Sequence, residues 1–301
     1  MSHTPPVCDY EGSNYQESFW DRGGRAYEDL AESIALRRML PKSGELMLEL
    51  GAGAGRNTSR YSGFQRVILL DYSTSQLSQA QKRLGRSENY IYVAADIYRL
   101  PFRDRLFDAA TMIRALHHMA DPSKALKQIR NVLGPGAIFI LEFANKRNFK
   151  AILRYLLGKQ TWNPFTLEPV EFAKLNFDFH PRTIRIWLQD LGLQIEKTLT
   201  VSHFRIGVFK KLIPARLLAA LDGLLQPTGD LFQFTPSIFI KARVSGHGQP
   251  THPPIKVTEL FKCPNCGSEK LEDRNDHLLC LNCSSGWAVR DGIYDFREQM
   301  E

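Results

Sequence analysis

Short apolar segments alternate with amphipathic ones between residues 44 and 143, and this alternation predicts the fold class. Apolar runs bounded by turn residues indicate buried strands, whereas apolar positions at three- and four-residue spacing indicate helices. Strands interleaved with helices are typical of a doubly wound α/β sheet, which we expect here. The predicted strands of this region are Leu46–Leu50, Arg66–Asp71, Tyr90–Ala94, Phe107–Ile113 and Ala137–Phe143.

Capping residues predict where two of the intervening helices begin. Ser73, with Gln76 three residues later, forms a capping-box pattern. Asp121 and Pro122 supply an N-cap and a first-turn proline, and Gly134 is expected to end the helix that follows. Later in the chain the pattern predicts a helix from Pro181 to Leu191, a strand over Leu193–Phe204, a helix over Ala215–Leu225 and a strand over Ser237–Val244.

Three changes in amino-acid composition divide the chain. Residues 15–40 are rich in aromatic side chains and predict an N-terminal helical lid, and residues 146–180 form a distinct segment before the final strands. Residues 246–256 combine glycine, proline and polar side chains, which is typical of a linker. We therefore predict a domain over 1–245 and a small domain over 257–301.

The loop after the first predicted strand carries alternating glycines, Gly51, Gly53 and Gly55, and a helix is expected to begin near Ala54 or Gly55. Glycine adopts positive φ and allows a ligand to lie against bare backbone. The spacing does not fit the dinucleotide fingerprint G-x-G-x-x-G, and no G-K-[ST] follows, which excludes a phosphate-cradling P-loop. Glu49, two residues before the first glycine, favours a cationic ligand over a pyrophosphate.

The pattern from Glu49 to Gly55 resembles the first motif of class I S-adenosylmethionine-dependent methyltransferases, E/D-x-G-x-G-x-G. Over residues 40–145 the chain is similar to the type 11 branch, which includes quinone-biosynthesis enzymes and wobble-uridine carboxyl methyltransferases of tRNA. The resemblance implies a Rossmann-like, seven-stranded sheet whose last strand is antiparallel. It also implies S-adenosylmethionine bound at the carboxyl ends of strands one to four.

Further cofactor-binding residues are expected where the second, third and fourth strands end. Asp71, followed by Tyr72, can accept hydrogen bonds from two ribose hydroxyls. Asp96 can accept from the adenine amino group, and Ile97 can cover the ring. Ile113, at the end of the fourth strand, completes this set.

Methyl transfer from a sulfonium requires alignment and exclusion of water, and a base only where the acceptor loses a proton. His117 and His118 could supply that base, or shape the following turn through hydrogen bonds to backbone. Arg114 could orient an anionic acceptor or pair with a nearby acid. The predicted domain over 1–245, which we call the body, contains a single cysteine, Cys8, and this disfavours methylation at pyrimidine C5. Residues 113–118 lack the Asn/Asp-Pro-Pro-aromatic motif, which disfavours methylation of amino groups.

The segment from residue 146 to 167 carries five cations and no acid, with aliphatic side chains at helical spacing. It belongs to residues 146–180, which lie where the resemblance implies a substrate cover. Such a basic amphipathic segment could contact RNA phosphates or a lipid–water interface. Alternatively, it could pack on the sheet and expose only its basic face.

Four of the five cysteines form a C-x2-C, 13-residue, C-x2-C pattern at Cys263, Cys266, Cys280 and Cys283. Two such turns supply the four thiolates of a tetrahedral zinc site, although spacing alone leaves iron open. The wider tail resembles the zinc-ribbon activator subunit of tRNA, rRNA and release-factor methyltransferases. Net charge is +7 in total but −3 over residues 246–301, so an acidic ribbon is expected to dock on a basic body by attraction.

These features together predict a methyltransferase with a stabilising zinc ribbon. We expect the acceptor to be an oxygen or ring nitrogen of a small or lipid-like metabolite. The alternatives are an enzyme acting on tRNA, rRNA or a translation factor, and a non-catalytic cofactor-binding scaffold whose ribbon recruits a partner. The sequence shows no apolar run long enough to span a membrane and no secretory signal, so we expect a cytoplasmic protein.

Overall fold

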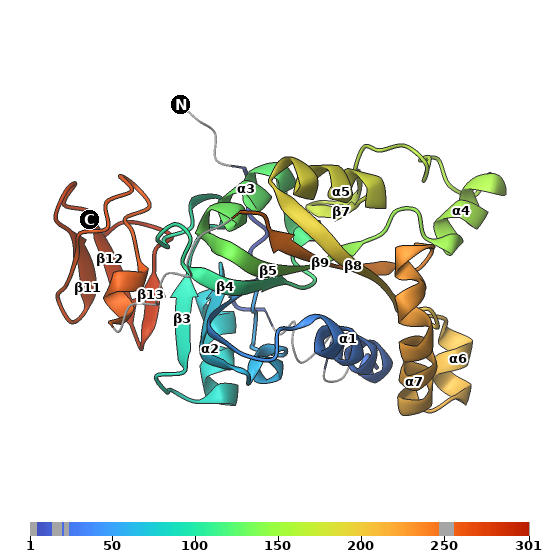
Figure 1. Ribbon diagram of the computed structural model, residues 1–301, viewed down its shortest axis with the longest axis horizontal. Helices are drawn as coiled ribbons and strands as arrows, with labels where there is room; N and C mark the ends of the chain where they lie inside the picture. Colours follow the sequence, from blue (N-terminus) through green and yellow to red (C-terminus); the bar gives the residue numbers. More distant parts are fainter. Residues whose placement is uncertain (1–4, 14–19, 21–23, 247–255, 301) are drawn as a thin grey trace.

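The computed structural model describes residues 5–13, 20, 24–246 and 256–300. These residues form an α/β fold in which helices cover both faces of one large sheet (Figure 1). The strands contributed by the body are β1 (Gly44–Leu50), β2 (Phe64–Asp71), β3 (Tyr90–Ala94), β4 (Phe107–Met112), β5 (Leu133–Ala144), β8 (Leu193–Val201) and β9 (Ser237–Val244).

These seven strands have the order β3-β2-β1-β4-β5-β9-β8. Strands β1 to β5 pair in parallel, whereas β9 is antiparallel to both β5 and β8. The expected seven-stranded sheet with an antiparallel last strand is therefore confirmed. The strand order reverses between β1 and β4, and open α/β sheets form their ligand crevice at such a point.

Both faces of the sheet are buried because alternate strand residues point to opposite layers. Leu46 and Leu48 pack in the core that contains α3, while Met47 packs in the core that contains α1 and α2. Strands of this kind are apolar at nearly every position, as the sequence pattern indicated. The main helices are α1 (Ala26–Met39), α2 (Thr74–Leu84), α3 (Pro122–Val132), α5 (Pro181–Asp190) and α7 (Ala215–Leu225).

The predicted helix starts are confirmed by their caps. The side chain of Ser73 accepts a hydrogen bond from the backbone N–H of Gln76, and Asp121 accepts from Lys124. His180 likewise caps α5. Each cap satisfies one of the backbone donors that a helix N-terminus leaves free.

Three local predictions were wrong. No α-helix follows the glycine loop, where only the 3-10 helix η2 (Thr58–Tyr61) forms. Gly134 does not end α3, because β5 already begins at Leu133 and includes it. The strand predicted to reach Phe204 ends at Val201.

The segment after β5 contains α4 (Phe149–Leu156) and a two-stranded sheet of β6 (Val170–Ala173) and β7 (Asn176–Asp178). The apolar side chains of α4 are mostly exposed, so the alternative in which this segment packs on the sheet and exposes only its basic face was wrong. Helix α6 (Gly207–Leu212) and the 3-10 helix η5 (Gln226–Asp230) flank α7. Within the described residues, no helix is both long and apolar enough to cross a membrane.

The C-terminal region adds four strands to the same sheet, giving 11 strands in total. Parallel pairing of β13 with β3 makes the join, with Ile293 opposite Tyr92 and Asp295 opposite Ala94. The ribbon therefore lies at one end of the molecule, beyond β3 (Figure 1). Its strands are β10 (Leu271–Asp273), β11 (His277–Cys280), β12 (Gly286–Arg290) and β13 (Ile293–Asp295).

Candidate functional site

The glycine loop has the backbone conformation that its composition predicted. Gly51, Gly53 and Gly55 have φ angles of 68°, 52° and 70°. A Cβ at Gly51 would lie 2.6 Å from the Cβ of Ala115, and one at Gly55 would lie 2.9 Å from the Cδ1 of Leu84. Gly53 has no such neighbour, so its lack of a side chain keeps the loop open on its ligand side.

One cavity lies beside this loop at the carboxyl ends of the central strands. It brings together most of the predicted cofactor-binding residues and two of the three predicted catalytic ones. The predicted residues that line it are Glu49, Gly51, Gly53, Asp71, Tyr72, Ile97, Ile113, Arg114 and His118. Gly55, Asp96 and His117 do not line the cavity.

Asp71 connects the end of β2 to the glycine loop. Its Oδ2 accepts a hydrogen bond from the backbone N–H of Gly53 at 2.8 Å, and its Oδ1 accepts from Ser73 at 2.9 Å. Burial raises the pKa of this carboxyl above its ordinary value. Each oxygen retains a lone pair for a further donor, so the group can hold the loop and still accept from a ligand hydroxyl.

Asp96 has a different local role. Its Oδ1 accepts from the backbone N–H of Tyr98 at 2.9 Å and caps the 3-10 helix η3 (Ile97–Arg99). This cap presents Ile97 to the cavity. Contact of Asp96 itself with a nucleobase stays a prediction.

Glu49 is the most perturbed acid of the cavity wall. Its carboxylate accepts from the hydroxyl of Thr58 at 2.6 Å, and burial raises its pKa to about 7. A buried carboxylate whose partners do not fully offset its loss of hydration costs folding free energy, whereas a cationic ligand beside it would recover that cost. Glu49 therefore favours a positively charged ligand group.

We expect Glu49→Gln to stabilise the ligand-free protein at alkaline pH while weakening cofactor binding. Between the ordinary pKa of 4.5 and about 7, the native state binds more protons than the unfolded state, so wild-type stability falls as pH rises. Above pH 7 the cost reaches on the order of 3 kcal/mol, which the neutral glutamine removes. Thermal unfolding of both proteins at pH 5 and pH 8 measures this difference. Identical pH dependence in the two proteins would contradict it.

His118 is hydrogen-bonded at both ring nitrogens. Nδ1 lies 3.1 Å from the carbonyl oxygen of Leu175, and Nε2 lies 3.0 Å from the hydroxyl of Tyr10. Because a carbonyl only accepts, Nδ1 carries the proton and Nε2 accepts from Tyr10. Burial lowers the pKa of His118, so the ring is a neutral acceptor near neutrality.

His117 packs against His118, with ring centroids 4.0 Å apart. Burial lowers its pKa well below the ordinary value. In the described part of the chain, its Nδ1 has no hydrogen-bond partner. A general-base role for either histidine stays a prediction.

Arg114 pairs with a buried acid beneath the cavity. Its Nε donates to Oε1 of Glu32 at 2.6 Å, and Arg56 donates to Oε2 of the same carboxylate at 2.7 Å. Burial alone would raise the pKa of Glu32, but the two arginines hold it below the ordinary value. The ring of Trp20 lies over both guanidinium groups, 3.6 Å from Arg56 and 5.0 Å from Arg114. Orientation of an acceptor by Arg114 stays a prediction.

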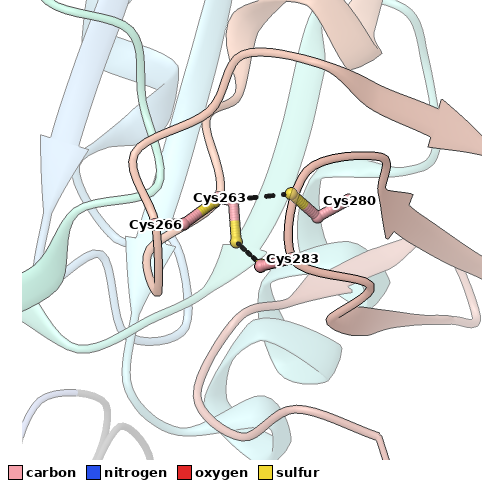
Figure 2. Close-up of side chains that lie close together, drawn as sticks. All are labelled: Cys263, Cys266, Cys280 and Cys283. Carbon is pink, nitrogen blue, oxygen red and sulfur yellow. Dashed lines mark hydrogen bonds between the residues drawn. The ribbon is translucent and has the colours of Figure 1, made fainter.

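The four tail cysteines converge on one point (Figure 2). All four Sγ atoms lie within 4.8 Å of one another, with Cys263 and Cys283 at 3.6 Å and Cys266 and Cys280 at 3.6 Å. Four thiolates about 2.3 Å from a tetrahedral ion would lie about 3.8 Å apart, so the spacing fits zinc.

The two cysteine turns repeat the same backbone geometry. Cys263 N–H donates to the carbonyl of Ser268, and Cys280 N–H donates to that of Ser285. Gly267 and Ser284 occupy equivalent positions, with φ of 74° and 59°. These knuckles aim the sulfur atoms inward without any disulfide.

Strand pairing and aromatic packing join the ribbon to the body. Phe261 stacks on Phe102 of the body at 5.8 Å and lies 4.9 Å from Phe296. Ion pairs of both polarities cross the join. Arg86 and Arg103 of the body pair with Asp291 and Glu269 of the ribbon, whereas Lys262 and Arg297 of the ribbon pair with Asp104 and Glu11 of the body. The predicted docking by attraction between an acidic ribbon and a basic body stays a prediction.

Comparison with known proteins identifies the family to which the chain belongs. Residues 48–141 match the model of a methyltransferase domain. The chain is 34% identical over 172 residues to the ubiquinone/menaquinone biosynthesis C-methyltransferase UbiE of Enterobacter sp., covering 51% of this chain and 68% of the relative. The chain belongs to the S-adenosylmethionine-dependent methyltransferase family.

Other relatives of the chain match over less of their length. The demethylmenaquinone methyltransferase of Clavibacter sepedonicus is 34% identical over 110 residues, which is 36% of this chain and 45% of the relative. The chain thus spans about half the length of such curated relatives. A solved complex between the Haloferax volcanii Trm112 methyltransferase activator and a methyltransferase has the same fold, with a TM-score of 0.54, 16% identity and coverage of 77% and 96% of the two chains.

The sequence did not reveal which segment of the methyltransferase covers the cavity. The predicted lid over 15–40 falls partly outside the described residues, although Trp20 lines the cavity and α1 packs against α7. The observed cover also includes Val7, Cys8 and Tyr10, with Val7 bridged to Met119. The polar N-terminal stretch has no periodic pattern of apolar residues, so only its tertiary contacts identify it as part of the cavity cover.

Proposed function

We propose that this methyltransferase transfers a methyl group from S-adenosylmethionine to an oxygen or ring nitrogen of a small or lipid-like acceptor. The observation that supports cofactor binding is the cavity in which Asp71, Glu49 and the glycine loop meet at the strand ends. The quinone-biosynthesis relatives support a lipid-like acceptor. An activated carbon is a second candidate atom, because the Enterobacter relative is named a C-methyltransferase.

Bound S-adenosylmethionine would supply the electrophilic methyl group, and the residues of the chain would align it and exclude water. Asp71 would accept from the ribose hydroxyls while Glu49 faces the positive end of the ligand. Tyr10 and Trp20 would close the cavity against solvent. Such positioning supplies much of the rate enhancement in a direct displacement.

We further propose that the four cysteines hold one zinc ion that stabilises the ribbon. The ribbon strands have three to five residues and could not bury a sufficient core alone. A folded ribbon then covers the otherwise exposed edge of β3. This role needs no contact between the metal and the methyl acceptor.

Incubation of the purified protein with methyl-labelled cofactor tests the acceptor class. Three separate pools are offered: an organic extract of cellular lipids and metabolites, total RNA, and a protein extract. Label in the organic pool supports the proposal, whereas label in RNA or protein supports the alternative of an enzyme acting on tRNA, rRNA or a translation factor. Tight binding of S-adenosylhomocysteine without transfer to any of the three pools would favour a non-catalytic scaffold.

A further inference from the structure

Exposed large apolar side chains are concentrated at one end of the molecule. In the part of the chain that the structure describes, 18 of the 21 such side chains lie within residues 149–172 and 206–234. Single exposed apolar residues are normal on a soluble protein, but a concentration of this kind marks an interaction surface. We call these two segments the apolar end. They include α4, α6 and α7, which lie opposite the ribbon (Figure 1).

Helix α4 exposes its apolar face instead of burying it. Phe149 is 67% exposed, Leu156 is 70% exposed and Leu157 is 58% exposed. Only Ala151 of this helix is buried. An amphipathic helix normally covers its apolar face with the core, so this face is available to a partner.

The second segment presents a matching surface. Leu212 is 77% exposed, Leu224 is 76% exposed and Leu231 is 79% exposed. The opposite face of α7 packs on α1 through the buried Leu218 and Ala219. The exposed leucines therefore do not contribute to the packing that holds α7 in place.

Basic side chains accompany this apolar surface. Residues 146–167 and 205–221, which cover most of the apolar end, contain no aspartate or glutamate, and the four acids of the apolar end lie outside these ranges, at Glu168, Glu171, Asp222 and Asp230. The exposed cations in these ranges include Lys150, Arg154, Lys159, Lys211 and Arg216. Apolar side chains interleaved with cations match the boundary between acyl chains and anionic headgroups in a bilayer.

We propose that the apolar end binds the surface of an anionic phospholipid bilayer. Leucine and phenylalanine side chains enter the acyl boundary while lysine and arginine contact lipid phosphates. A second copy of the chain is a poorer occupant, because a twofold contact would bring the same cations together. RNA is also poorer, because it would leave the leucines in water.

Flotation with lipid vesicles tests the proposal without cofactor or acceptor, so its outcome is independent of the proposed reaction. We expect wild-type protein to bind vesicles of phosphatidylcholine and phosphatidylglycerol, and to bind phosphatidylcholine alone weakly. The triple variant Leu156→Ser, Leu224→Ser, Leu231→Ser should lose on the order of 100-fold in partitioning, from the apolar area no longer buried. These side chains lie mostly in water, so unfolding of the variant is not expected.

Two matched variants sharpen the test. Leu281→Ser removes a leucine that is 58% exposed on the ribbon, and it should leave vesicle binding unchanged. The variant Lys150→Ala, Arg154→Ala, Lys159→Ala should lose binding to anionic vesicles and its dependence on salt.

Five results would overturn the proposal. The first three are absence of vesicle binding by the wild-type protein, unchanged binding by the triple leucine variant, and an equal loss in Leu281→Ser. The fourth is a wild-type dimer that the leucine variant converts to a monomer without any binding to vesicles, which would assign the apolar end to a second copy. Binding of RNA that needs the three cations but not the leucines would assign it to nucleic acid instead.

Discussion

Replacement of Asp71 by alanine is expected to lower the affinity for S-adenosylhomocysteine by about 100-fold, because hydrogen bonds to a charged acceptor contribute roughly 1.5–3 kcal/mol each. The carboxylate lies at the cavity and would accept from ribose hydroxyls. It also holds the backbone of Gly53 at 2.8 Å and that of Ser73 at 2.9 Å. Loss of these contacts loosens the loop as well, so the variant should also unfold at a lower temperature.

Asp108 provides a matched control for this second effect. Its Oδ2 accepts from the backbone N–H groups of Glu45 at 2.8 Å and Leu46 at 2.9 Å, and it does not line the cavity. Asp108→Ala should therefore lower thermal stability to a similar degree and leave ligand affinity nearly unchanged. Isothermal titration of both variants separates binding from stability. Binding by Asp71→Ala within threefold of wild type would remove Asp71 from the ligand site.

Elements with a strong local pattern were predicted well from the sequence. Strand β3 over Tyr90–Ala94, strand β9 over Ser237–Val244 and helix α7 over Ala215–Leu225 have the predicted bounds. The helix expected after the glycine loop was not found. Positive φ at Gly51, Gly53 and Gly55 excludes helix up to that point, and between Gly55 and the start of β2 at Phe64 only the 3-10 helix η2 forms.

The cavity was predicted where its residues follow strands, since the carboxyl ends of parallel strands meet at one edge. Contacts between distant segments could not be predicted in this way. The hydroxyl of Tyr10 reaches His118 across 108 residues, and Tyr92 pairs with Ile293 across the predicted linker. Neither contact leaves a periodic signal, because each depends on the folded arrangement of separate elements.

The exposed leucines of the apolar end show a different limit of sequence patterns. The spacing of Phe149, Leu153 and Leu156 indicated an amphipathic helix, and α4 forms there. Periodicity does not show whether such a face meets the core or the solvent. Only burial distinguishes these two cases, and Leu156 is 70% exposed.

Removal of the metal should unfold the ribbon while leaving the rest of the sheet folded. Binding of zinc to four cysteines contributes on the order of 10 kcal/mol to the folding of small zinc domains. The ribbon holds only a small core, with Leu278 and Trp287 buried beside Cys263 and Cys280. We expect the wild-type protein to contain about one zinc per chain, and Cys280→Ser to contain little.

Unfolding of the ribbon has a consequence at the body that hydrogen exchange can measure. The edge of β3 loses its pairing with β13, so amides from Tyr92 to Ala94 should exchange faster in Cys280→Ser. Arg297 of the ribbon tail also donates to the carbonyl oxygen of Tyr72, which lines the cavity, so ligand affinity should fall by a few-fold. Cys8→Ser is the control, because Cys8 is not part of the four-sulfur cluster. This variant should retain both its zinc and the protection of the β3 amides. Full β3 protection in zinc-free Cys280→Ser would mean that strand pairing and aromatic packing hold the ribbon without a metal.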